Sequence, residues 1–450
     1  MNENHCSRRT FIKLGASAGV LSSLGQLSLE AQAQDYKALV CVFMFGGNDG
    51  FNTVVPATAG EYSAYSNIRG SLALTSSQLL PITTVNGGQY ALHPGLLEMQ
   101  PLFQTGKLAV VANTGILNQP TTQAQYEQSL VPLPAQLFSH SDQITEMQSG
   151  APGGSFGTGW GGRVLDLLQS NNANAVGPVS ISFNGSSLYC AGQVVSGTNL
   201  QPGNNLTQDA MNSGWPQSVI DAFTAGQRQI IGLTNGRRVV AAADKVFGDA
   251  LQLNALLTTL PNGGFQTQFP NTGIGEQLEN VARFISVRAQ TAVGRQIFFC
   301  GLGSFDTHSD QLATQSDLFQ QASQAMKAFY DATVELSVDR QVTTFTLSDF
   351  GRTFEPSGSG TDHGWGNHLL VLGGAVKGQR IHGQFPILNP SNPAYDPNAF
   401  ADNRGVMLPT TSLAQFGATL ATWMGASDPQ LNGLFPELAN FQVRNLGFMA

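Results

Sequence analysis

Three short hydrophobic runs along the chain each end in small residues and a carboxylate. They read "KALVCVFMF" before "GGNDG", "RQIFFC" before "GLGSFDTHSD", and "RQVTTFTL" before "SDFGRT". Runs of this length, rich in Val, Ile, Phe and Thr, are typical of buried β-strands. The carboxylates that follow them are Asp49, Asp306 and Asp349.

Helical patterns lie before the second and third runs, in "GEQLENVARFISVRAQTAVG" and "DLFQQASQAMKAFYDATVEL". Alternating strands and helices predict an α/β fold, with a mostly parallel sheet covered by helices on both faces. The three carboxylates then share the sheet edge where ligands usually bind. Gly46, Gly47 and Gly50 allow a tight turn that presents Asp49. The alternative for Asp49 is a turn residue that hydrogen-bonds its own backbone.

The middle of the chain is less regular. Residues 149–215 are dense in Gly, Asn, Ser and Pro and are typical of loops with short β segments, and residues 217–260 have a helical pattern. We interpret residues 34–450 as one domain, in which residues 150–275 form a loop-rich insertion that caps the sheet.

The N-terminus has the pattern of an export signal. "SRRTFIK" precedes the weakly apolar "LGASAGVLSSLGQLSL" and then "AQAQ", with a cleavage site expected after Ala33. Residues 1–33 are therefore predicted to be a twin-arginine signal peptide, and the mature protein is predicted to be periplasmic or secreted. A chance arginine pair before an ordinary helix agrees less well with the order of these features. No run reaches the ~18 apolar residues of a transmembrane helix.

Charge and cysteine content narrow the classes of partner. Charged residues are 11% of the chain, the net charge is −8, and no basic stripe is present. This balance argues against a nucleic-acid partner. Cys41, Cys190 and Cys300 remain after signal removal, without a C-x-x-C motif. They predict no disulfide framework, and Cys41 and Cys300, inside apolar runs, are expected to be buried.

Four of the six histidines in the mature chain share a short segment with an aspartate, in "FSHSDQ", "FDTHSD" and "GTDHGWGNH". One such pair is usually structural, but three clusters favour a site. Asp oxygens together with imidazoles suit Zn, Mn or Fe better than Mg or Ca. Two metal ions that clamp an ester displacement need about six ligands. The predicted metal ligands are Asp49, Asp306, His308, Asp349, His363 and His368, with Asp362 as a further candidate.

Three residues are candidates for catalysis. Arg352 could hold an oxyanion bidentately, or it could pair with a nearby carboxylate such as Glu355. The others are His140 and a serine beside it: Ser139 or Ser141 could act as a nucleophile activated by a metal or a base. Alternatively, Ser139 could be the N-cap of the helix that "SHSDQITEMQ" predicts.

Several motifs together resemble a known family. In order, they are "FMFGGNDGFNTVVP", "LHPGL", "GKLAVV", "TGWGGR", "FDTH", "LSDFGRT" and "GTDHGWGNHLLVLGGAVKG". They resemble the bacterial family called domain of unknown function 1501, over nearly the whole mature chain. Members of that family resemble the alkaline phosphatase and sulfatase superfamily and often carry twin-arginine signals. The resemblance implies an alkaline phosphatase-like fold, with Asp49, Asp306 with His308, Asp349 and His363 as metal ligands.

The chain departs from that superfamily at two positions. Superfamily members commonly have three residues between the aspartate and the histidine of this motif, whereas "DTH" has one. Phe350, directly after Asp349, stands where the superfamily commonly has a histidine. The first hypothesis is nevertheless an exported, metal-dependent hydrolase of small anionic phosphate or sulfate esters. A metal-free esterase of the SGNH type fits less well, because "GGND" and "DTH" occur at the wrong places along the chain. The alternative from another class is a non-catalytic periplasmic binding or assembly protein on a degenerate sulfatase-like fold.

Overall fold

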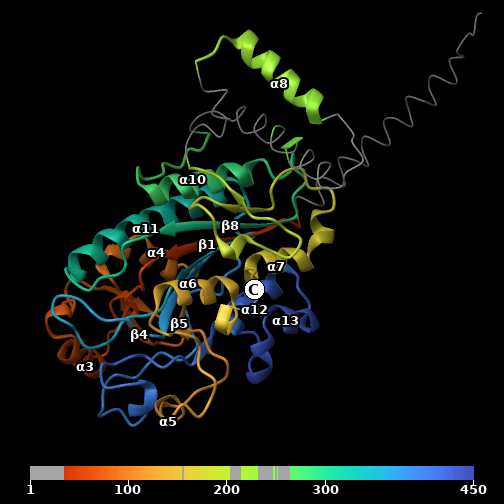
Figure 1. Ribbon diagram of the computed structural model, residues 1–450. Helices are drawn as coiled ribbons and strands as arrows, with labels where there is room; N and C mark the ends of the chain where they lie inside the picture. The colour runs from red at the N-terminus through yellow and green to blue at the C-terminus, as the bar shows by residue number, and fades with distance from the viewer. Residues whose placement is uncertain (1–34, 155–156, 203–213, 232–246, 249–250, 252–263) are drawn as a thin grey trace, which may run out of the picture.

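Within the described residues, nine strands form one sheet in the order β11-β5-β10-β9-β1-β8-β6-β7, with β12 also paired to β5. The computed structural model describes residues 35–154, 157–202, 214–231, 247–248, 251 and 264–450 (Figure 1). Only β10 runs antiparallel to its neighbours. The strands are β1 Lys37–Met44, β5 Leu108–Gly115, β6 Ser180–Ser182, β7 Thr198–Asn199, β8 Arg295–Leu302, β9 Val342–Ser348, β10 Asn367–Leu372, β11 Ile381–His382 and β12 Thr411–Ser412.

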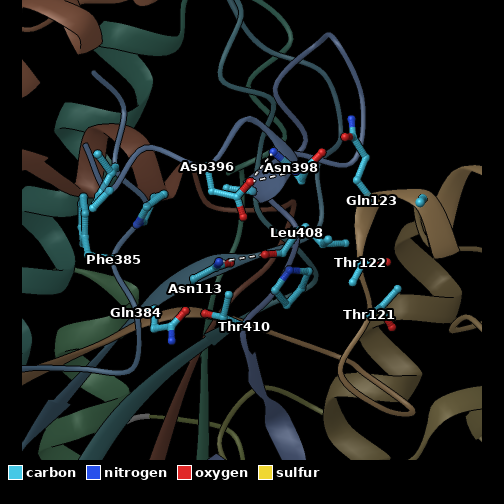
Figure 2. Close-up of a pocket in the computed structure, with 16 residues that line it drawn as sticks. Asn113, Thr121, Thr122, Gln123, Gln384, Phe385, Asp396, Asn398, Leu408 and Thr410 are labelled. Carbon is cyan, nitrogen blue, oxygen red and sulfur yellow. Dashed lines mark hydrogen bonds between the residues drawn. The ribbon is translucent and has the colours of Figure 1, made fainter. Parts of the chain in front are cut away.

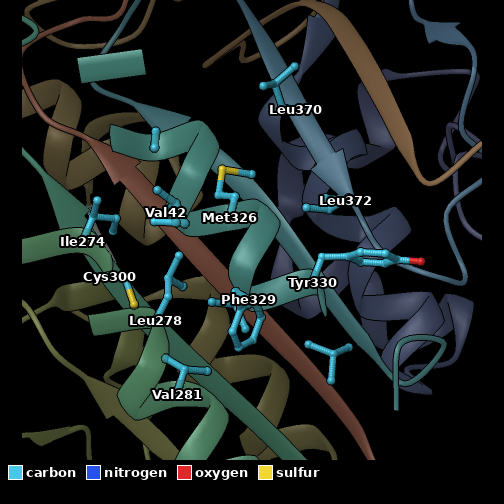
Figure 3. Close-up of a cluster of buried hydrophobic side chains, with 14 of the residues drawn as sticks. Val42, Ile274, Leu278, Val281, Cys300, Met326, Phe329, Tyr330, Leu370 and Leu372 are labelled. Atoms are coloured by element: carbon cyan, nitrogen blue, oxygen red, sulfur yellow. The ribbon is translucent and has the colours of Figure 1, made fainter. Parts of the chain in front are cut away.

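Helices cover both faces of this sheet, which confirms the predicted α/β class. Alternate residues of β1 enter different cores: Val40 and Val42 pack on one face, and Leu39 and Cys41 on the other. Figure 3 shows the first core, where Met326 lies near Val42 and Leu278 near Cys300. The helices on that face are α4 Met99–Gln104, α10 Gly273–Ser286 and α11 Gln311–Glu335; those on the other face are α7 Trp160–Leu167, α12 Leu413–Met424 and α13 Asp428–Leu434.

A small antiparallel sheet follows the first strand of the large one. It consists of β2 Val54–Pro56, β4 Gln89–Leu92 and β3 Leu80–Thr83. The remaining described helices are α2 Gly50–Thr53, α3 Ala59–Arg69, α5 Gln123–Glu127, α6 His140–Ser149 and α8 Gln217–Ile231. None of the described helices has the length and apolar character needed to cross a membrane.

The described part of the segment from 150 to 275 contributes strands to the sheet itself. It contributes β6 and β7 to one edge, and α7 packs its buried Trp160 and Val164 into a core. Much of its second half lies outside the described residues, as does the predicted signal peptide, residues 1–33. The capping role of this segment and the division at Ala33 stay predictions.

Strand direction explains why distant polar segments meet. β1, β8 and β9 are parallel, so the residues that follow them lie at one edge of the sheet. Because β10 is antiparallel to β9, the connection between them must begin and end at that same edge. This brings "TDHGWGN" beside Asp306 and Asp349.

Candidate metal centre

A cluster of three imidazoles and one carboxylate lies at this edge. Asp306 and His308 follow β8, His363 precedes β10, and His140 is the first residue of α6. His140, Asp306 and His363 offer ligand atoms that all lie within 4.8 Å of one another. The Nε2 atom of His308 lies 3.0 Å from both Asp306 Oδ1 and His363 Nε2. We call these four residues the histidine–aspartate cluster.

The glycine turn after β1 packs against the cluster. Gly46 has φ of 114°, and a Cβ at this position would lie 2.3 Å from the backbone nitrogen of Asp306. Only glycine permits both this conformation and this approach. The Gly46 N–H donates to the carboxylate of Asp349, at 3.2 Å from each oxygen. The turn therefore connects the segments that follow β1, β8 and β9.

His140 is oriented by Asp349. Its Nδ1 lies 2.7 Å from Asp349 Oδ2, so the carboxylate accepts the ring proton at Nδ1. The Nε2 atom then carries a lone pair. It is buried without a hydrogen-bond partner among the described residues and lies 3.5 Å from Asp306 Oδ2. Asp349 thus holds the ring with its lone pair turned toward the cluster.

The rings of His363 and His308 are oriented in the same way, with an oxygen beside Nδ1 and with Nε2 toward Asp306. His363 Nδ1 lies 2.7 Å from the carbonyl oxygen of Phe138, which can only accept, so Nδ1 carries the proton. Its Nε2 lies 3.4 Å from Asp306 Oδ1. His308 Nδ1 faces Asp362 Oδ1 at 3.5 Å. In all three rings Nδ1 has an oxygen partner, and Nε2 points toward Asp306.

Charges in the cluster favour an ionised carboxylate and a neutral imidazole. Burial acts to raise the pKa of Asp306, but the hydrogen bond and charge of Arg352, together with His308 and His140, outweigh it, and the pKa is lowered. Burial also lowers the pKa of His363, and its bond to the Phe138 carbonyl only partly opposes this. Burial raises the pKa of Asp349, against the hydrogen bond from His140. Neutral imidazole and ionised carboxylate are the forms that bind a cation.

The cluster fits a single divalent ion. Ligand atoms about 2.0–2.1 Å from a tetrahedral zinc ion lie ~3.3 Å from one another. The separations of 3.0, 3.4 and 3.5 Å between imidazole nitrogens and Asp306 oxygens lie on either side of that value. Metal-binding histidines usually donate the other ring N–H to a carboxylate or a backbone carbonyl, as His140 and His363 do. The structure brings His140, Asp306 and His363 together as one group, with His308 beside Asp306 and His363, rather than the six ligands expected for two ions.

Two predicted ligands lie apart from the cluster. The buried carboxylate of Asp49 pairs with Arg69, accepts from Gln311, and caps α2 through the Phe51 N–H at 3.0 Å. His368 is fully buried, accepts from the Asn113 N–H at 3.1 Å, and stacks on Phe385. Asp49 thus hydrogen-bonds its own backbone, as in the alternative given for it above, and it also forms a buried ion pair. His368 is a core residue of β10.

Two further predicted ligands, Asp349 and Asp362, lie behind histidines rather than beside Asp306. Asp349 holds His140, and Asp362 faces His308. Both act as outer partners that fix ring orientation, a role that short sequence spacing does not distinguish from direct ligation.

The proposed catalytic residues also have defined places. Arg352 is fully buried and donates to the carbonyls of Gly46, Gly47 and Thr361 as well as to Asp306. Its donors are engaged within the protein, so it positions Asp306. Ser139 occupies the N-cap position of α6 without a cap hydrogen bond, and its hydroxyl donates to Asp142 Oδ2 at 2.5 Å.

Phe350 forms an apolar wall behind two of the histidines. Its ring centroid lies 4.9 Å from that of His140 and 4.7 Å from that of His363. A Cβ on Gly47 would meet the same ring at 2.4 Å. The residue that departs from the superfamily pattern therefore packs against two imidazoles and adds no ligand.

The sheet and the cluster together define a mostly parallel α/β protein with a histidine- and carboxylate-lined centre beyond its strand ends. The chain belongs to the family described as "Protein of unknown function (DUF1501)", which matches residues 36–428. No curated protein matches the chain significantly.

Similarities to solved structures are distant. Ps i-CgsB in complex with k-i-k-neocarrahexaose has 9% identity and a TM-score of 0.38, with 89% of this chain and 74% of that chain covered. PsFucS1 sulfatase from Pseudoalteromonas sp. has 10% identity and a TM-score of 0.32, covering 82% and 68%. The lipoteichoic acid synthase LtaP from Listeria monocytogenes has 9% identity and a TM-score of 0.26, with 70% of this chain and 56% of that chain covered. TM-scores this low carry no argument about this chain.

Proposed function

We propose that the protein is an exported, metal-dependent hydrolase of phosphate or sulfate esters, with one divalent ion held by the histidine–aspartate cluster. One observation carries the proposal: His140 and His363 have their Nδ1 atoms hydrogen-bonded to oxygens, and the Nε2 atoms of these two rings and of His308 lie 3.0–3.5 Å from the carboxylate of Asp306. Such a ligand set suits Zn, Mn or Fe.

Residues of this chain would hold the ion and leave it open to a substrate. His140, His308 and His363 with Asp306 are the proposed ligands, and Arg352 fixes the carboxylate by an ion pair. The side chains of Asp306 and His308 are 46% and 48% exposed, so a substrate can reach the centre from solvent. When bound, the ion would act as a Lewis acid toward an ester oxygen. Ser139, with Asp142 as its proton acceptor, stays the candidate nucleophile.

The ester class rests on the motif resemblance to the alkaline phosphatase and sulfatase superfamily, together with the chemistry of the ligand set. The export part rests on the arginine pair, apolar segment and cleavage pattern of residues 7–33. Localisation by cell fractionation tests it: replacement of Arg8 and Arg9 by lysine should hold the precursor inside a bacterium that has a twin-arginine system. Export of the variant at the level of the wild-type protein would contradict this route.

Elemental analysis of the protein, purified without chelator, tests the metal proposal. We expect about one equivalent of a transition metal in the wild-type protein and almost none in His363→Ala. The matched control is His382→Ala, because His382 lies outside the cluster and bonds only backbone carbonyls. Metal in the wild type and in the control, but not in His363→Ala, supports the proposal and leads to a screen of phosphate and sulfate esters.

A folded wild-type protein without metal, or equal metal content in all three samples, would overturn the proposed centre. A second candidate function is then a non-catalytic binding or assembly protein. It is favoured by one specific observation: the Arg352 side chain is fully buried and each of its nitrogens donates to a group of the protein, so the arginine predicted to hold an oxyanion is not exposed to a ligand. Stoichiometric metal without turnover of any ester would also favour it.

A further inference from the structure

A cavity of about 470 Å³ lies apart from the histidine–aspartate cluster, and none of the cluster residues lines it. Asn113 of β5 forms part of one wall, the segment around α5 forms another, and the connection that follows β11 completes it (Figure 2). Its size is within the usual range for small-molecule sites. The cavity is open to solvent, so an exogenous ligand can enter.

Asn113 has a conformation that a regular strand would not give it. The register of β5 against β10 shifts between Thr114 and Val111, which leaves one extra residue in β5 at this point. Asn113 has φ of 47°, a sparsely populated value for a residue other than glycine. A β-bulge re-aims a side chain, and such local strain is concentrated at functional sites. The bulge turns Asn113 to the cavity.

The amide of Asn113 is only half used. Its Nδ2 donates to the Leu408 carbonyl at 2.8 Å, while its Oδ1 is buried and has no partner among the described residues. Gly366, which does not line the cavity, covers that oxygen closely, since a Cβ there would lie at 2.3 Å. An orphaned buried acceptor and a left-handed backbone both cost stability, which marks Asn113 as a strained position in the cavity wall.

The walls are fixed before any ligand binds. Glu61 accepts from the backbone N–H groups of Leu388 and Asn389 and from the side chain of Asn392, which holds the connection after β11. On the opposite wall, Thr122 and Gln125 form a capping box that fixes the start of α5. Pre-organised walls lower the entropic cost of binding.

The lining defines the chemistry of the ligand. Short neutral side chains such as Thr121, Gln384 and Thr410 can both donate and accept, and Phe385 and Pro409 add apolar faces. None of the lining residues, all of them in the described part of the chain, is Lys, Arg or His, and Asp396 is the one carboxylate. This composition disfavours phosphate and sulfate. It matches a molecule whose hydroxyl groups alternate with C–H faces.

From the strained Asn113 in its wall, the fixed walls and the neutral lining, we infer that this cavity is a carbohydrate-binding site for an uncharged sugar unit. The site is separate from the histidine–aspartate cluster and does not depend on metal there. If both proposals hold, the cavity would bind the neutral part of a glycan ester.

Calorimetric titration with neutral tetrasaccharides tests this inference. The probes are cellotetraose, maltotetraose, laminaritetraose and mannotetraose, each titrated to millimolar concentration. We expect at least one to bind with one site per chain. Ala124→Trp should weaken that binding by 10-fold or more, because Ala124 lines the cavity from an exposed position and a large ring there fills it. Glu127→Trp, exposed on the same helix but outside the lining, should bind like the wild type.

A second pair of variants keeps this test apart from the metal proposal. Gln384→Ala with Thr410→Ala, both exposed, should lose several-fold affinity without a change in fold. His363→Ala should bind the sugar with unchanged affinity. The inference is overturned if none of the four sugars binds, if Ala124→Trp binds as tightly as Glu127→Trp, or if affinity disappears in His363→Ala.

Discussion

At the scale of single residues, the structure divides the aspartates of the strand ends by role. Asp306 faces the imidazoles, Asp349 holds one of them, and Asp49 turns the other way into a buried ion pair with Arg69. The same position after a strand thus gives three different environments. The difference arises from partners that lie far away in the sequence, such as Arg69 and His140.

Asp49→Ala should therefore cost stability rather than metal. Arg69 is fully buried and would keep its bonds to the carbonyls of Thr353 and Phe354 but lose its counter-charge. Removing one partner of a buried pair costs about 3–5 kcal/mol. We expect urea unfolding to show a loss of that size, while metal content per folded molecule stays constant.

A second variant separates the ion pair from other effects of the truncation. Asp49→Ala combined with Arg69→Met removes both charges and should recover part of the lost free energy of unfolding. Metal loss in Asp49→Ala with an unchanged free energy of unfolding would instead restore Asp49 to the ligands.

At the scale of elements, the turn after β1 is the part on which the cluster most depends. Gly46→Ala should be strongly destabilising, because the added Cβ would lie 2.3 Å from the Asp306 nitrogen in a backbone conformation that disfavours L-residues. Gly87→Ala is a matched control, since Gly87 has φ of 84° but open space around it. The control should lose about 1–2 kcal/mol from conformation alone.

Gly46→Ala should lose more stability than the control and also bind metal more weakly, since Asp306 must shift. Urea unfolding and a competition titration with a metal chelator measure the two effects. If Gly46→Ala and Gly87→Ala lose equal stability and bind metal equally, the close approach of the turn does not support the cluster.

The sequence predicted the elements better than it predicted the contacts between them. The runs that became β1, β8 and β9 were recognisable because β-branched and aromatic residues, with few charges, are typical of buried strands. The edge at which Asp306, His308 and His363 meet followed from that prediction. The antiparallel direction of β10 and the bulge at Asn113 left no comparable pattern, because tertiary pairing decides both. His140 was a candidate for catalysis, but its Nε2 direction depends on Asp349, 209 positions away.

At the scale of the whole molecule, buried histidines make the stability of the protein dependent on pH. Burial lowers the pKa of His93 and of His368 to about 3, from an ordinary value of 6.5. Below pH 6.5 the unfolded chain binds protons at these positions and the folded chain does not. Stability is therefore lost as the pH falls from 6.5 toward 3, at up to about 1.4 kcal/mol per pH unit for each group.

His93→Asn should remove one of these two contributions. His93 accepts from the Gly95 N–H at 2.9 Å as the N-cap of a short helical turn, Pro94–Leu96, and Asn is a suitable cap that does not titrate. We expect a less stable protein at pH 7, because the ring contact with Phe319 is lost. Between pH 6 and 4.5, however, its free energy of unfolding should fall less steeply than that of the wild type, by about 1 kcal/mol per pH unit.

Leu96→Ala is the control: it removes buried apolar atoms from the same turn, so it should lower stability equally at each pH and keep the wild-type slope. Other titrating groups, including those of the cluster, contribute equally to all three proteins and cancel in the differences between slopes. If His93→Asn and Leu96→Ala show the same slope, His93 is protonated in the folded protein over this range, and its burial does not produce the acid sensitivity.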